Sequence, residues 1–290
     1  MAEPLEPAAY CDASLREHDR DRWLAHLFAP AEHRPALAAL YAFNIEIARI
    51  RELVSGPMPG EVRLQWWADV VEGQGRGEVS AHPVAAALLA AIERYRLPRK
   101  PFLDLIEARR FDVYDDPMPS LADLEGYCGE TASALFRLAS LILADGNDPG
   151  FADVAGHAGV AYAMTGLARA FPAHAARGQV YLPADLLARH GATTDDILNG
   201  VASPPVLAAL ADLRGQARRH LDAATAAAAG APPAVLLACL PVTLVAGWLT
   251  LMDRARYQPF KDAVDIPQWR RQWTLWRSTR RGGLGASPKT

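Results

Sequence analysis

The chain has few cysteines and no pattern that pairs them. Its 290 residues include three cysteines, Cys11, Cys128 and Cys239, far apart and without Cys-x-x-Cys or Cys/His spacing. Disulfide frameworks and structural zinc sites depend on such spacings, so neither is expected. The acidic, proline-containing start of the chain also lacks the positive charge and apolar core of an export signal. We therefore expect a protein of the reducing cytoplasm.

The chain also lacks an excess of charge of either sign. It carries 30 basic and 33 acidic residues, for a formal net charge of −3. Nucleic-acid-binding domains usually show a basic surplus on one face, so no nucleic-acid partner is expected. Any basic binding surface must be local.

Runs rich in β-branched and aromatic residues, which are typical of strands, are nearly absent, whereas alanine and leucine dominate. Prolines precede apolar periodic segments, as they do at helix starts. The fold class predicted is therefore all-α. Without a repeat or linker, we expect a single domain over residues 1–290, with its core at about 15–277.

Helix boundaries follow from the same signals. Pro30 opens a helix that "SGPMPG" (55–60) ends, Pro83 and Pro101 open the next two, and a Ser120/Asp123 capping box precedes another. The remaining helices are predicted at 151–171, just before Gly191, at 205–228, at 233–255 and at 265–280.

The longest apolar run, residues 231–252, contains no charged residue. Its length nearly matches the roughly 20 residues that span a bilayer. Pro241 and Gly247 interrupt the run, and a large α-helical domain needs a helix that is buried on all sides. We favour a central core helix, with a membrane span as the alternative.

Three segments carry a resemblance to a known family. They are "LFAPAEHRPALAALYAF" (27–43), "YCGETAS" (127–133) and "RGQVYLP" (177–183). In this order and spacing they resemble landmark segments of the squalene/phytoene synthase family. The resemblance implies the isoprenoid synthase fold, in which many helices surround a central cavity, and head-to-head joining of prenyl diphosphates.

Members of that family carry two aspartate-rich motifs on facing helices. Carboxylates at i and i+4 share one helical face, and two such faces can hold Mg²⁺ ions that bridge to a diphosphate. The resemblance places Ala48 and Glu52 at the first motif and Ala170 and His174 at the second. Residues 154–184 contain no Asp or Glu at all. We therefore expect no metal site and no cofactor.

Two functions remain open. Residues 42–73 and 82–89 resemble the branch that contains the mitochondrial assembly factor for respiratory complex I, which implies a non-catalytic role with complex I subunits as partners. The alternative is an active prenyltransferase that condenses farnesyl or geranylgeranyl diphosphate with Mg²⁺. Its catalytic candidates would be Glu52, Asp112 and Tyr41.

A ligand other than a metal-bound diphosphate is a further alternative at the cavity mouth. Arginine forks can hold phosphates or carboxylates without a metal, which would suit an isoprenoid or anionic lipid. The alternative is solvated ion pairs at helix spacing, such as Arg49 with Glu52 or Glu46. The candidate ligand-binding residues are Tyr41, Arg49, Glu52, Arg169, His174, Arg177 and Tyr181, with Arg51 nearby.

Several other polar residues have ordinary explanations. "FDVYDDP" places Asp112 where the family keeps an aspartate, but the segment also reads as turn chemistry, which we favour. Asp19 and Asp21 fall where active relatives have serines that contact diphosphate. His157 and His190 are interpreted as structural.

The segment 267–283 is the strongest local basic feature. Trp269, Trp273 and Trp276 fall on one helical face, and five arginines surround them. This composition is typical of an interfacial helix on anionic lipid, although the helix could instead dock on the domain, or do both. Peripheral contact with the inner face of a membrane is therefore one expectation.

Overall fold

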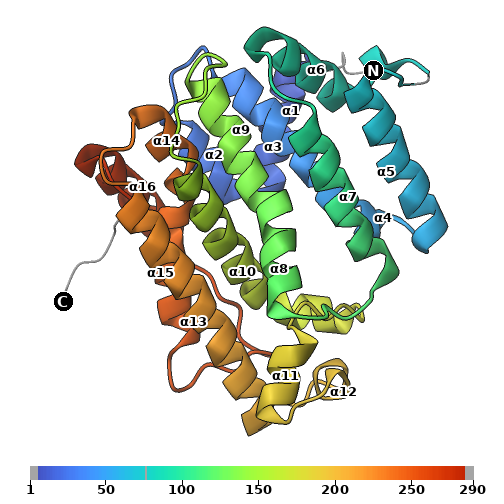
Figure 1. The fold of residues 1–290 in the computed structure, drawn as a ribbon, viewed down its shortest axis with the longest axis vertical. Helices are drawn as coiled ribbons and strands as arrows, with labels where there is room; N and C mark the ends of the chain where they lie inside the picture. Colours follow the sequence, from blue (N-terminus) through green and yellow to red (C-terminus); the bar gives the residue numbers. More distant parts are fainter. Residues whose placement is uncertain (1–5, 76, 285–290) are drawn as a thin grey trace.

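The computed structural model describes residues 6–75 and 77–284, in which all regular structure is helical (Figure 1). The α-helices are α1 (Pro7–His18), α2 (Arg20–His26), α3 (Arg34–Ala48), α4 (Ile50–Leu53), α5 (Pro57–Glu72), α6 (Pro83–Tyr95), α7 (Lys100–Tyr114), α8 (Leu121–Cys128), α9 (Ala134–Leu143), α10 (Ala152–Ala176), α11 (Ala184–His190), α12 (Thr194–Leu198), α13 (Pro204–Ala227), α14 (Pro233–Ala238), α15 (Val245–Met252) and α16 (Gln268–Arg281). Short 3₁₀ segments, η1 (Val79–Ala81) and η3 (Leu240–Leu244), and one π-helical segment, η2 (Gly129–Ser133), complete the set. The predicted all-α class is confirmed.

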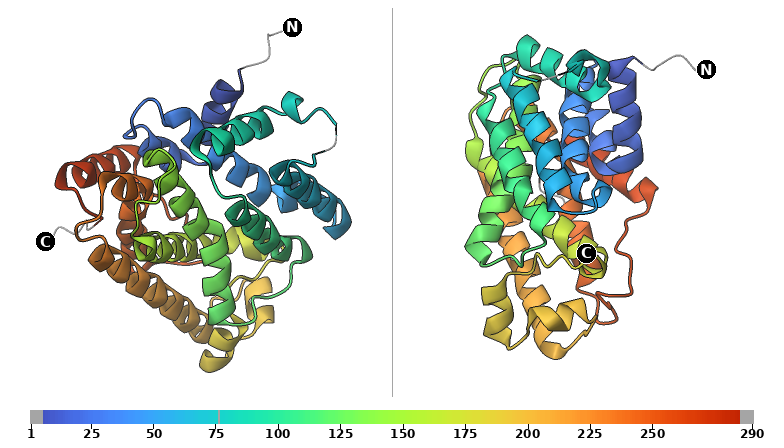
Figure 2. Two further views of the ribbon diagram at one scale, coloured as in Figure 1. Left: turned by 45° about the horizontal axis from the view of Figure 1, so that its top comes forward. Right: turned by 90° about the vertical axis from the view of Figure 1, so that its right-hand side faces the viewer.

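The apolar side chains form two adjoining cores. One gathers α1, α3, α5, α6 and α7, and the other gathers α8, α10, α13 and α15. In the right-hand view of Figure 2 the N-terminal helices lie at the top and α11–α13 at the bottom. In the first core, Phe43 meets the rings of Trp67 and Phe102 edge-on, at centroid distances of 5.3 and 5.6 Å. Such pairs add about 1 kcal/mol beyond area burial.

The predicted helix after Ser120 is interrupted by η2. Ser120 begins α8 as its N-cap, with the Asp123 amide donating to Ser120 Oγ at 3.1 Å, but the predicted box is only half formed, because the Asp123 carboxylate accepts from the Ser120 hydroxyl and not from the Ser120 amide. At η2 the helix widens to π geometry, and α10 packs directly against this segment through Gly159. A Cβ on Gly159 would lie 2.3 Å from the Ser133 backbone, so only glycine permits this approach.

The prediction of one continuous helix over 233–255 is wrong. Pro241 lacks a backbone N–H and clashes with the preceding turn, so the chain divides into α14, η3 and α15. These segments supply buried residues to the second core, as the core-helix interpretation expected. Among the described residues, none of the helices combines the length and apolar character that crossing a bilayer requires.

Three predicted boundaries shift for local reasons. Pro30 lies in a turn, and α3 begins at Arg34 with Pro35 in its first turn. The "SGPMPG" segment is only partly a break, because α5 starts at Pro57. Helix α10 continues through Pro172 to Ala176, one turn beyond the predicted end.

Candidate functional site

The helix ends that carry the residues assigned by resemblance to the two motifs lie beside each other. Arg177, at the end of α10, donates from Nη1 to Glu52 Oε1 of α4 at 2.7 Å. Arg49 Nε approaches the other oxygen of Glu52 at 4.0 Å. Glu52, the one carboxylate among the four positions that the resemblance assigns to the motifs, therefore lies against two guanidinium groups.

The other three motif positions offer no anionic ligand. Ala48 and Ala170 are half-buried methyl groups. His174 packs its ring 4.7 Å from that of Tyr181. Burial, reinforced by Arg177 and Arg109, lowers the pKa of His174 to about 4, so the imidazole is neutral at pH 7.

Asp112 is the centre of a buried hydrogen-bond cluster. Tyr181 Oη donates to its Oδ1 at 2.7 Å and Tyr127 Oη donates at 2.9 Å, while Arg109 Nη1 lies 3.0 Å from Oδ2. Burial raises the pKa of Tyr127 well above its usual range, so that phenol stays a donor. The carboxylate is therefore saturated by donors rather than free to accept a substrate proton or a metal.

The turn interpretation of "FDVYDDP" is wrong for Asp112 and correct for Asp115. Asp112 lies inside α7 with 6% of its surface exposed. Asp115 ends the helix in the left-handed region, with φ at 57°, and its carboxylate binds Arg51. Helix α7 continues through Asp112 to Tyr114, so the turn begins only at Asp115.

The Arg22 side chain lies between three helices. No sequence motif predicted this position. Its guanidinium lies 4.9 Å from the ring centroid of Tyr162 on α10, 5.5 Å from Tyr41 on α3 and 5.9 Å from Phe136 on α9. Its Nη1 donates to Asp19 Oδ2 at 2.6 Å. Tyr41 is thus a wall of a buried cation–π cage.

Asp21 binds a second arginine cluster. Arg271 Nη1 of α16 donates to its Oδ1 at 2.7 Å, and Arg169 Nη1 lies 3.9 Å from its Oδ2. The Arg169 guanidinium also stacks 4.0 Å from the ring centroid of Trp248. The arginines predicted to share one cavity mouth are therefore divided among Glu52, Asp115 and Asp21.

The two histidines interpreted as structural are paired with other side chains. His157 Nδ1 lies 3.0 Å from Nδ1 of His220, and His190 Nε2 lies 2.8 Å from Asp212 Oδ2. These contacts join α10 and α11 to α13.

The donor set does not suit a magnesium cluster. Mg²⁺ is usually held by carboxylates together with substrate phosphates. Within residues 6–75 and 77–284, His, Cys, Asp and Glu side chains nowhere form a group of three or more placed to hold a metal. Glu52 faces cations instead of other carboxylates, and Asp112 is fully hydrogen-bonded.

Helix α16 packs on the domain through the face that carries Arg271, and not through its tryptophan face. Arg271, Leu275 and Ser278 are buried, whereas Trp269, Trp273 and Trp276 expose 64%, 54% and 42% of their surfaces. Docking therefore leaves the tryptophan face open, and the two expectations for this helix are compatible.

Comparison with known proteins identifies relatives that are similar in sequence and in fold. Complex I assembly factor 6 of Rattus norvegicus is 30% identical over 280 residues, covering 91% of this chain and 82% of that protein. Phytoene synthase of Thermus thermophilus is 32% identical over 206 residues, covering 70% and 68%. The crystal structure of a dehydrosqualene synthase superposes with a TM-score of 0.78 at 19% identity, covering 95% of both chains, which shows the predicted isoprenoid synthase fold.

The squalene/phytoene synthase family model matches residues 15–277, nearly the whole described chain. The chain therefore belongs to the squalene/phytoene synthase family.

Proposed function

We propose that this protein is a non-catalytic family member that assists the assembly of respiratory complex I at the inner face of a membrane. The similarity to complex I assembly factor 6 over 91% of the chain supports the assembly role. The open tryptophan face of α16 supports the membrane contact.

The pairing of Glu52 with Arg177 carries the non-catalytic part of the proposal. Ionisation of an allylic diphosphate develops negative charge that bound Mg²⁺ normally neutralises. A site with one carboxylate, already paired with a cation, repels divalent ions. The candidate set of Tyr41, Arg49, Glu52, Arg169, His174, Arg177 and Tyr181 stays a prediction for binding of an isoprenoid or other anion.

Turnover tests this part directly. Purified protein is incubated with farnesyl or geranylgeranyl diphosphate, Mg²⁺ and NADPH, and released pyrophosphate is measured. We expect none above a protein-free control. Sustained release that disappears in Glu52→Ala would instead establish the alternative, an active head-to-head prenyltransferase, which the 32% identity to a phytoene synthase favours.

The assembly role is tested in the organism that carries the gene. Deletion should lower the amount of assembled NADH:quinone oxidoreductase, seen as intact complex on a native gel. Complementation by Glu52→Ala should restore that amount, because the role does not use the carboxylate chemically. An unchanged level after deletion would remove the proposed role.

A further inference from the structure

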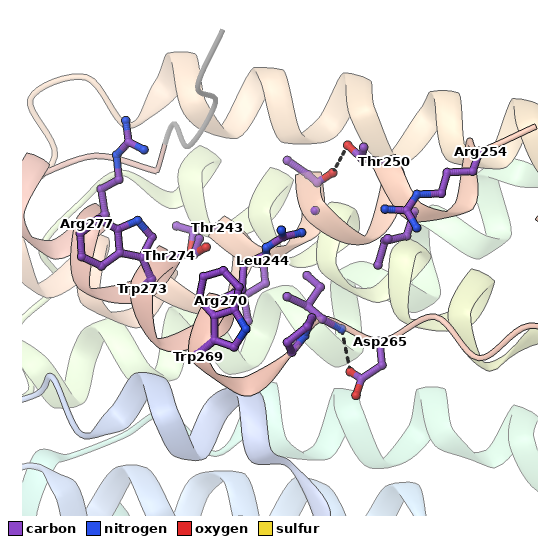
Figure 3. Close-up of a pocket in the computed structure, with 15 residues that line it drawn as sticks. Thr243, Leu244, Thr250, Arg254, Asp265, Trp269, Arg270, Trp273, Thr274 and Arg277 are labelled. Atoms are coloured by element: carbon purple, nitrogen blue, oxygen red, sulfur yellow. Dashed lines mark hydrogen bonds between the residues drawn. The ribbon is translucent and has the colours of Figure 1, made fainter. Parts of the chain in front are cut away.

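A groove of about 950 Å³ separates α15 from α16 and the segment before it (Figure 3). Ala246, Gly247 and Leu251 of α15 form one side, and Ile266 closes the floor. Trp269 of α16 stands on the opposite side. The volume falls at the upper end of the range typical of small-molecule sites.

The groove carries positive charge without local compensation. Figure 3 shows Arg254 towards one end, Arg277 towards the other and Arg270 between them. Within the part of the chain that the structure describes, none of these three arginines has a carboxylate within ion-pair distance. Asp265, the one acidic residue among the described residues of the lining, already binds Arg271 and accepts from the Ile266 amide at 2.9 Å.

The groove continues onto the tryptophan face of α16. Trp269 and Trp273 line both the groove and a shallower hollow of about 530 Å³, which Trp276 completes. Trp273 and Trp276 stack at a centroid distance of 4.9 Å. Indole rings of this kind are enriched at the level of lipid headgroups. An amphiphile lying in the groove would therefore emerge beside side chains suited to the membrane interface.

We propose that the groove between α15 and α16 takes one acyl chain of an anionic phospholipid, with the lipid phosphate held by the arginines of its rim. The inference rests on the membrane contact of the proposed function and adds a defined lipid site to it. An apolar floor would not contribute to the binding of a free phosphate, and unpaired arginines would not contribute to the binding of an apolar peptide. Guanidinium groups match phosphate oxygens in pairs, which selects a phosphate-bearing lipid.

Photo-crosslinking tests the site. The full chain is mixed with vesicles of phosphatidylcholine and phosphatidylglycerol in which the phosphatidylglycerol carries a photoreactive acyl chain, and modified residues are mapped by mass spectrometry. The expected products are adducts on residues 244–251. Thr250 lines the groove one turn from Ala246 and bonds only its own helix, through Oγ1 to the Ala246 carbonyl at 2.8 Å.

Thr250→Trp should fill the groove and remove the adducts on α15, while Thr250→Ser should retain them. Vesicle flotation of Thr250→Trp should persist, because the tryptophan face remains. Arg270→Gln should lower vesicle affinity about fivefold, the equivalent of the roughly 1 kcal/mol that one arginine contributes near an anionic surface. Arg281→Gln makes the same charge change on α16 outside the groove. It should reduce the adducts on α15 less than Arg270→Gln does.

Three outcomes would overturn the lipid site. Adducts confined to residues 269–276 would show surface contact alone, which leaves the proposed membrane contact intact. Absence of vesicle binding would remove that contact as well. Loss of the α15 adducts upon addition of inorganic phosphate, with flotation unchanged, would identify a soluble anion as the occupant.

Discussion

At the scale of residues, two aspartates near the start of the chain form internal contacts with arginines. Where the resemblance places serines that contact diphosphate, Asp19 and Asp21 hold Arg22 and Arg271. The sequence indicated that these positions depart from phosphate binding. It could not indicate the partners, because Arg271 stands 250 residues away from Asp21 in the chain.

Removal of Asp112 should destabilise the fold strongly. Asp112→Ala would leave Arg109 with a largely buried and uncompensated charge, which typically costs about 3–5 kcal/mol in the free energy of unfolding. Asp115→Ala, the matched control in a more exposed pair with Arg51, should cost about 1 kcal/mol or less. Urea denaturation compares the two variants. Equal losses would contradict the cluster's structural role.

The neutral state of His174 predicts that the free energy of unfolding depends on pH. Its pKa is lowered from 6.5 to about 4, so below pH 6.5 the unfolded chain binds a proton that the folded chain does not. The contribution of His174 to stability is thus complete above pH 6.5 and declines as the pH falls towards 4. Between pH 7 and pH 5 the wild type should lose about 2 kcal/mol more in the free energy of unfolding than His174→Phe. Parallel losses, measured by urea denaturation, would refute a buried neutral imidazole.

At the scale of elements, the helix start signals predicted most of the fold and tertiary contacts decided the rest. The N-cap at Ser120 and the prolines at 83 and 101 mark helix starts as predicted. The interruption at η2 was not visible in the sequence, because it depends on the approach of α10 from elsewhere in the chain. Pro241, in contrast, was a visible signal whose effect on the 233–255 helix was underestimated.

The close approach at η2 can be measured. Gly159→Ala places a methyl group against the Ser133 backbone and should lower the free energy of unfolding by about 1–3 kcal/mol. Gly156→Ala, one turn earlier on α10, meets no atom within 4 Å and should raise it by up to about 1 kcal/mol. If thermal unfolding gave both variants the same change in stability, the close contact between α10 and η2 would be contradicted.

At the scale of the whole molecule, the chain keeps the family fold, and the four positions that the resemblance assigns to metal binding hold one carboxylate, Glu52. The three landmark segments predicted the isoprenoid synthase fold, which the structural comparison confirms. The lack of a carboxylate at three of those four positions could also be read from the sequence. Contacts elsewhere in the molecule, such as the Arg22 cage and the Asp21–Arg271 pair, required the structure, because cation–π and ion-pair partners leave no local pattern in the sequence.

The most direct test is the magnesium dependence of binding of an unreactive prenyl diphosphate analogue. Calorimetric titration with farnesyl thiodiphosphate is performed with and without Mg²⁺ on the full chain. With Glu52 held by Arg177 and no carboxylate at Ala48, Ala170 or His174, the affinity should not increase when Mg²⁺ is added. A strong magnesium-dependent increase, lost in Glu52→Ala, would show that the site still gathers metal and would contradict the account.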